Sequence, residues 1–167
     1  ELDDYANIAR GLLFIYDATA DKLWLQRATE LITVMLQKFE DSAQGDFYAT
    51  VGNSGFTRAK SRTDVDQASS NGAALDVLAR LSRRTNDLLV KTKAERAMTT
   101  LSGIAMQAPA GSASILAAAA RLQQGELGQV RYAGGGNVRI VSQPLRAEKR
   151  LKVTMTIAPG WHINADR

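Results

Sequence analysis

The chain has 167 residues, of which 45% are hydrophobic and 23% are charged, so it has room for one globular domain and a small further part. It contains no cysteine and one histidine, which excludes disulfides, thiol catalysis, thiolate-bound metals and a multi-histidine metal site built from one copy. The net charge is +4, but the basic residues stand singly and without interleaved aromatic residues, so we expect no nucleic-acid partner.

The first hundred residues repeat a pattern of two apolar helices joined by a short polar corner. Apolar residues at helical spacing predict helices over 3–18 and 22–40, joined by a Thr-Ala-Asp corner. The pattern returns over 70–85 and 87–107, joined by a Thr-Asn-Asp corner, with Ser70 or Asn71 expected to cap the third helix. Tandem hairpins bury their apolar faces by stacking on neighbours, so the sequence predicts antiparallel hairpins from an incomplete α/α toroid or solenoid.

Residues 41–68, between the two hairpins, break the helical pattern. The run 47–51 reads as a short strand, and turns over 44–46 and 52–55 on either side of it predict a small β-hairpin. The polar segment 58–67 follows. Of all parts of the helical region, this segment is the one that packing explains least, and loops of this length are often functional.

The residue pattern changes class near the end of the chain. A fifth helix is predicted over 112–123, after which apolar and polar residues alternate with period two, which predicts strands over 130–132, 138–141 and 151–157. The glycines at 134–136 read as a turn and not as a phosphate-binding loop, since no helix follows.

The predicted fold class is therefore mainly α with a short C-terminal β segment. We divide the chain into partial helical hairpins over 1–124 and a β segment over 125–167, which we interpret as an incomplete immunoglobulin-like module. Some 40 residues are too few for an independent sandwich, so the β segment is expected to pack on the helices, to pair with another copy or to await further strands.

Several motifs of the helical region, taken together, resemble one family. They are Leu2–Ala6, Gly11–Leu13, Tyr16–Thr19, Trp24–Leu25, Ala28, Met35, Phe39 and Gly45–Thr50. They resemble the toroid domain of a widespread uncharacterised family, to which the spermatogenesis-associated thioredoxin-like protein of animals belongs. Its members join a thioredoxin-like domain to a six-hairpin α/α toroid, similar to those of N-acylglucosamine 2-epimerases and six-hairpin glycosidases. The resemblance covers roughly residues 1–122 and implies a central cavity for a sugar-like ligand.

The segment 64–71 fits a further motif of this family, Asp-x-Ala-x-Pro-Ser-Gly-Asn. This chain has Ala-Ser-Ser-Asn over 68–71 where the family has Pro-Ser-Gly-Asn, and the loss of Pro and Gly changes the backbone freedom of the loop. The polar groups of Asp64, Asp66, Ser69 and Asn71 remain, in a loop that leads to a helix N-terminus, where anions and hydroxyl groups bind readily.

We therefore interpret these four residues either as caps and turn formers or as contacts to a ligand. A glycosidase would need two carboxylates on opposite sides of a bound sugar. Asp64 or Asp66 could supply one of them, but no second carboxylate is identifiable. We assign no catalytic residue, metal or cofactor, and whether the protein is an enzyme stays open.

The end of the chain carries a second resemblance. Residues 157–165 are similar to the Gly-Trp-His strand of the immunoglobulin-like N-terminal domain of thiol:disulfide interchange proteins. Trp161 and His162 are either structural or part of a docking surface for a partner thiol domain.

These observations lead to two hypotheses for a chain that we expect to be a fragment, because it opens without Met and both of its ends look cut. In the first, it is the toroid part of a larger thioredoxin-like protein and binds or processes a carbohydrate. In the second, it is a non-catalytic structural module that positions the thioredoxin-like domain of the same parent chain. An incomplete toroid exposes apolar helix faces, so self-association is expected under both.

Two further expectations concern location. No apolar run approaches the roughly 18 residues of a membrane span, so no membrane partner is expected. No signal peptide is visible, which makes the cytoplasm the default compartment.

Overall fold

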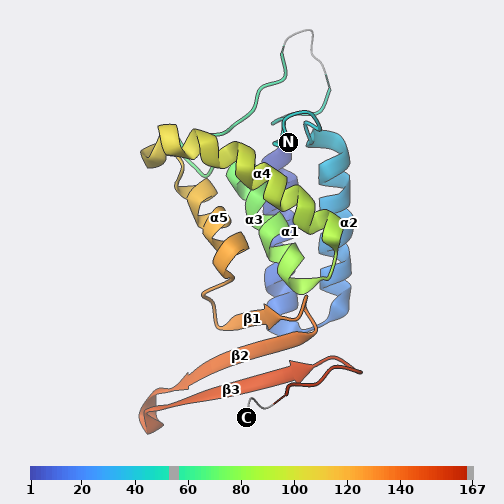
Figure 1. Ribbon diagram of the computed structural model, residues 1–167, viewed down its shortest axis with the longest axis vertical. Coiled ribbons are helices and arrows are strands. Elements are labelled where there is room, and N and C mark those ends of the chain that lie inside the picture. Colours follow the sequence, from blue (N-terminus) through green and yellow to red (C-terminus); the bar gives the residue numbers. More distant parts are fainter. Residues whose placement is uncertain (53–56, 165–167) are drawn as a thin grey trace.

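The computed structural model describes residues 1–52 and 57–164, and these residues form a mainly α structure with a small β-sheet (Figure 1). This confirms the predicted fold class. The elements are α1 (Leu2–Thr19), α2 (Lys22–Phe39), α3 (Ser70–Arg84), α4 (Leu88–Gln107), α5 (Ala113–Gln124), β1 (Val130–Ala133), β2 (Val138–Leu145) and β3 (Arg150–Ile157). Short 3-10 turns lie at Pro109–Gly111 and Arg146–Glu148.

The helices form two layers. α1, α3 and α5 run in the same direction, and α3 packs against both of the others (Figure 1). α2 returns along α1, and α4 crosses back over α3 and α5, so consecutive helices are antiparallel. None of the helices in the described ranges is both long and apolar enough to span a membrane.

Side chains cap the N-termini of α2, α3 and α4. Asp21 accepts a hydrogen bond from the N–H of Leu23 at the start of α2, and Asp87 does the same for Leu89 at the start of α4. The expectation that Ser70 or Asn71 caps the third helix was wrong. Ser69 is the cap, because its hydroxyl accepts from the N–H of Gly72 at 3.1 Å, while the Asn71 side chain has other partners.

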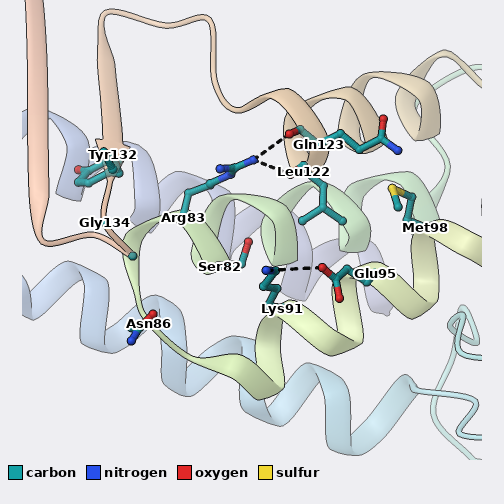
Figure 2. Close-up of a pocket in the computed structure, with 12 residues that line it drawn as sticks. Ser82, Arg83, Asn86, Lys91, Glu95, Met98, Leu122, Gln123, Tyr132 and Gly134 are labelled. Atoms are coloured by element: carbon teal, nitrogen blue, oxygen red, sulfur yellow. Dashed lines mark hydrogen bonds and ion pairs between the residues drawn. The ribbon is translucent and has the colours of Figure 1, made fainter. Parts of the chain in front are cut away.

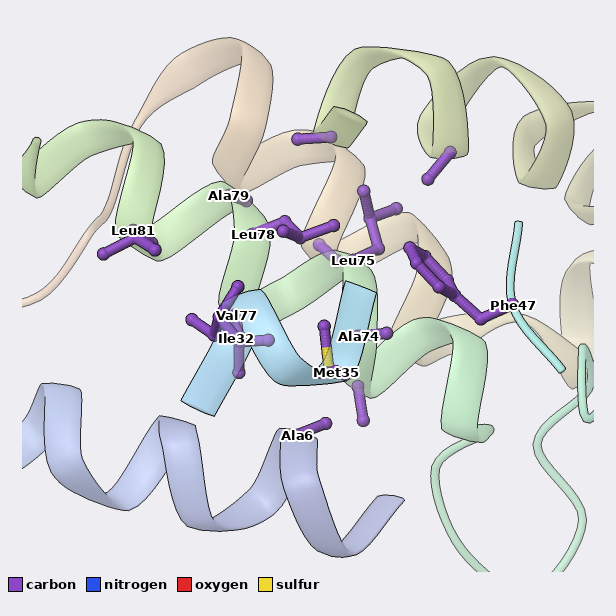
Figure 3. Packing of buried hydrophobic residues seen from close by; sticks show 14 of the residues in the cluster. Ala6, Ile32, Met35, Phe47, Ala74, Leu75, Val77, Leu78, Ala79 and Leu81 are labelled. Atoms are coloured by element: carbon purple, nitrogen blue, oxygen red, sulfur yellow. The ribbon is translucent and has the colours of Figure 1, made fainter. Parts of the chain in front are cut away.

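The core lies between the two layers, around α3. Figure 3 shows the side chains of Leu75 and Leu78 from α3 together with Met35 from α2 and Phe47 from the loop after it. Alanines such as Ala74 let the helix backbones approach closely, which allows large residues to interdigitate beside them. α3 is therefore buried on most of its circumference.

The predicted strand over 47–51 was wrong. Phe47 forms an isolated bridge with Glu40, and the next two backbone N–H groups donate to the carbonyls of Phe39 and Ala59, which lie on different segments. No ladder forms because each backbone group pairs with a different partner. The predicted turn over 52–55 lies mostly outside the described residues.

The sheet is an antiparallel meander in the order β1, β2, β3. Tyr132 pairs with Arg139 across the first two strands, and Ile140 pairs with Met155 across the second pair. Only β1 and part of β2 pack toward the helices, and every residue of β3 is exposed. The 124/125 domain boundary stays a prediction, although the sheet does pack on the helical part.

A buried ionic cluster joins the sheet to the ends of the helices. The Arg84 side chain is fully buried at the end of α3 and donates two hydrogen bonds to Asp17 of α1, at 2.6 and 2.8 Å. It also donates to Glu126 after α5, at 2.9 and 3.1 Å. From the sheet, the Tyr132 hydroxyl donates to Asp17, and its ring lies under the Arg84 guanidinium. Arg84 therefore joins three helix ends and β1.

The cluster also changes the titration of Tyr132. Burial and the neighbouring charge of Asp17 raise the pKa of the Tyr132 hydroxyl above its ordinary value of 10.0. This shift stabilises the fold below pH 10, and the stabilisation is lost as the pH rises toward the folded-state pKa.

The glycine turn between β1 and β2 rests directly on the end of α3. Gly134, Gly135 and Gly136 all have positive φ, with 89° at Gly136. A Cβ added at Gly136 would lie 2.1 Å from the carbonyl oxygen of Arg84. Figure 2 shows Gly134 in this turn, near Asn86 in the corner after α3. Gly136 therefore allows the turn to contact the backbone of α3 directly.

Candidate functional site

Asp64 links the loop before α3 to the start of α5 by hydrogen bonds. Its carboxylate accepts hydrogen bonds from the N–H of Ser69 at 2.8 Å and from the N–H and hydroxyl of Ser114 at 2.8 and 2.5 Å. The N-cap of α5, Ser112, makes no capping hydrogen bond, so Asp64 satisfies an N–H of the first turn from a distant segment. Burial alone would raise the pKa of Asp64, but the hydrogen bonds from Ser114 and Ser69 outweigh it and lower the pKa.

This lowered pKa predicts acid sensitivity. The charged carboxylate of Asp64 contributes stability above its ordinary pKa of 3.8, and the contribution is lost as the pH falls through the lower folded-state pKa. We expect the free energy of unfolding to fall below about pH 4 and to fall less steeply in Asp64→Asn. Denaturant titrations from neutral to acidic pH measure this. Asp66→Asn is the matched control, and equal slopes in both variants would contradict the prediction.

Asn71 is buried and closes the loop around Phe47. Its side-chain oxygen accepts from the N–H of Phe47 at 2.8 Å, and its amide donates to the carbonyls of Phe47 and Ser61 at 2.8 and 2.9 Å. The amide thus pairs with Phe47 in the way that a neighbouring strand would. This contact holds the Phe47 ring in the core.

Asn71→Ala should destabilise the protein by about 1–3 kcal/mol, because it leaves buried backbone groups of Phe47 without partners. Thermal and chemical unfolding measure the change. Gln67→Ala, at an exposed amide of the same loop, should have no measurable effect. A loss in Asn71→Ala no larger than in this control would contradict the role of the amide.

The structure brings Asp64, Ser69 and Asn71 together at the start of α3 but leaves Asp66 exposed, without a hydrogen bond in the described part of the chain. The polar atoms of the first three are occupied by contacts within the fold. This favours their interpretation as caps and loop formers.

A charged furrow begins beside this corner, on the face of α1, α3 and α5 that α2 and α4 do not cover. We define it by Arg10, Phe14, Asp76, Arg80, Arg121 and Glu126. Two hollows of about 180 and 420 Å³ form it, and both are lined by Arg80 and Arg121. Gly72 and Ser114 line the smaller hollow, so the corner lies at one end of the furrow.

Cations and carboxylates alternate along the furrow. Arg80 donates to Asp76 and to Glu126, both at 2.9 Å, and Arg121 also binds Asp76. The guanidinium of Arg80 lies 4.7 Å from the centre of the Phe14 ring, which is 49% exposed. The furrow therefore presents hydrogen-bond donors, acceptors and an aromatic ring side by side.

Sequence reasoning missed the furrow, although one signal was present. Asp76, Arg80 and Arg84 recur every four residues in α3, which places three charges on one face. Charged residues are seldom buried without partners. That spacing could have indicated a polar face on α3.

Trp161 and His162 lie in the segment after β3 and are both exposed. The Trp161 ring is close to Gly134 of the glycine turn, where a Cβ would lie 3.1 Å from it. The same region carries an exposed apolar row on one face of β3, formed by Leu151, Val153, Met155 and Ile157. Within 1–52 and 57–164, no group of three or more His, Cys, Asp or Glu side chains could hold a metal.

Comparison with known proteins gives one relative. No family model matches the chain. The chain is similar to part of spermatogenesis-associated protein 20. Over 83 residues, which are 48% of the chain, it is 34% identical to this protein of Rattus norvegicus, and the match covers 10% of the rat protein. The chain thus matches only a small part of this curated relative. The similarity supports the resemblance to spermatogenesis-associated proteins. It shows neither a toroid nor a thioredoxin-like domain.

Proposed function

We propose that this chain is a helical-toroid part of a larger thioredoxin-like protein, in which the charged furrow forms one wall of a cavity for a sugar-like ligand. The observation that carries the proposal is the position of the furrow. It lies on the layer of parallel helices and on the face that the second layer leaves open. In an α/α toroid, that face of the inner helices would line the central cavity.

The chemistry of the furrow supports a polyhydroxylated ligand. Guanidinium groups donate only, and one nitrogen of Arg80 and two of Arg121 have no acceptor in the described part of the chain, so they match the hydroxyl oxygens of a sugar. The exposed ring of Phe14 offers an apolar surface for the C–H face of the sugar. We assign no reaction to the furrow.

The proposal is tested by calorimetric titration of the protein with N-acetylglucosamine and glucose. We expect saturable binding of at least one of them, with affinity about tenfold lower in Arg121→Ala and in Phe14→Ala. Arg150→Ala removes an exposed arginine of β3, outside the furrow, and should bind like the unaltered protein. Absence of binding, or an equal loss in Arg150→Ala, would contradict the proposal.

A second candidate function rests on a different observation. The exposed apolar row on β3, with half-exposed Trp161 nearby, suits a protein partner better than solvent. In this case the chain positions a thioredoxin-like domain of the same larger protein. Met155→Asp should abolish complex formation with such a domain in sedimentation experiments, whereas Thr154→Asp, on the opposite face of the strand, should not. Loss of the complex in both variants, or in neither, would oppose this function.

A further inference from the structure

A second cavity lies where the end of α3, the side of α4, the end of α5 and the glycine turn meet (Figure 2). Its volume is about 450 Å³. None of the residues that line it also lines the furrow, so its function is independent of the proposed sugar site. A cavity of this size accommodates a small organic molecule.

The polar side of the cavity carries two cationic side chains, Arg83 and Lys91, and one carboxylate, Glu95. One terminal nitrogen of Arg83 binds the backbone carbonyls of Leu122 and Gln123, at 2.6 and 3.2 Å. Among the described residues, the other terminal nitrogen and Nε of Arg83 have no acceptor. The Arg83 contact also covers the carbonyls at the end of α5, which would otherwise repel a negative charge.

Lys91 adds a second positive charge. Its ammonium nitrogen lies 3.8 Å from Glu95, the acidic residue of the cavity, which is beyond hydrogen-bonding distance. The Lys91 and Glu95 side chains are 58% and 52% exposed, so the pair is weak and its cation is accessible. The amide of Asn86, at the rim, has no hydrogen-bond partner in the described part of the chain.

Part of the lining is apolar. Met98 of α4 and Leu122 of α5 form it, and Figure 2 shows the Leu122 side chain between Arg83 and Met98. A ligand that is acidic at one end and apolar at the other would match both parts of the lining. Methionine adapts its shape to varied apolar groups, so the apolar part suits a short alkyl chain.

We propose that this cavity binds a small organic anion. Its acidic group lies between Arg83 and Lys91, and its apolar part packs on Met98 and Leu122. The acidic group is a carboxylate or a phosphate ester, since both offer acceptor oxygens to a guanidinium and an ammonium group.

The experiment uses hexanoate, hexyl phosphate and 1-hexanol as probes in NMR titrations of the protein. We expect saturable shifts of the Met98 methyl and the Asn86 side-chain amide with at least one anion and none with hexanol. The stronger of the two anions identifies the acidic group. Signals of the furrow arginines should not move, which separates this site from the sugar site.

Variants localise the binding. Lys91→Ala should weaken the anion about tenfold or more, and Lys91→Arg should retain most of the affinity because the charge is kept. Lys152→Ala removes the same charge from exposed β3 and should have no effect. Lys91 is exposed, so its removal should leave the fold intact. Lack of saturable anion binding, equal weakening by Lys152→Ala, or equal binding of hexanol would overturn the proposal.

Discussion

Replacing Arg84 by alanine lowers the free energy of unfolding by about 3–5 kcal/mol. The substitution removes the cation that binds two largely buried carboxylates, Asp17 and Glu126, whose side chains are 14% and 8% exposed. Glu126 keeps Arg80 and Asp17 keeps the hydroxyl of Tyr132, but both lose their main counter-charge. A buried charge without a partner is more costly than the pair was favourable.

Arg84→Lys should also be destabilising, because one ammonium group cannot reproduce the guanidinium geometry that binds two carboxylates at once. Arg27→Ala is the matched control. It breaks an exposed pair with Glu30, and its cost should stay below about 1 kcal/mol. Denaturant unfolding at neutral pH measures all three variants. A cost for Arg84→Ala as small as that of the control would show that the cluster does not hold the helix ends.

Replacing Gly136 by alanine lowers the free energy of unfolding by about 2–5 kcal/mol. The backbone at Gly136 has a φ of 89°, and a left-handed conformation costs an alanine about 1–2 kcal/mol. The new Cβ would also lie 2.1 Å from a backbone carbonyl of α3, which cannot rotate away as a side chain would. Such overpacking costs about 1–3 kcal/mol in addition.

Gly160→Ala separates these two effects. Gly160 has a φ of 81°, but a Cβ there would meet no atom within 4 Å. Gly160→Ala should therefore lower the free energy of unfolding only by the cost of the left-handed conformation. The difference between the two variants then measures the cost of the contact with α3. Hydrogen exchange in β1 should be faster in Gly136→Ala than in Gly160→Ala. Identical unfolding and exchange would mean that the turn does not rest on α3.

The helices could be predicted from sequence because their apolar residues recur at helical spacing. The predicted bounds of α1 and α2 lie within one residue of those observed. The strands after residue 125 were also predicted from alternation, but β2 continues to Leu145, past the predicted end at residue 141, because Pro144 and Leu145 still pair with β3. Local pattern therefore predicts elements well and their ends less well.

The errors came from residues whose partners are distant in sequence. Phe47–Val51 has the composition of a strand, but Asn71, 24 residues after Phe47, binds the backbone that a strand partner would need. The predicted cap of α3 was also wrong, because the Asn71 side chain binds Phe47 and Ser69 caps the helix instead. Arg84 binds Asp17, which lies 67 residues earlier in the chain, and no local sequence pattern predicts that pair.

Whether the furrow binds a sugar is tested most directly by the guanidinium Nε–H signals of Arg80 and Arg121, recorded by NMR while N-acetylglucosamine or glucose is added. We predict that both signals shift and saturate together with the ring signals of Phe14, while those of Arg27 and Arg150 stay in place. Unchanged furrow signals with both sugars, or equal shifts at all four arginines, would contradict the assignment of this face as the ligand-binding surface.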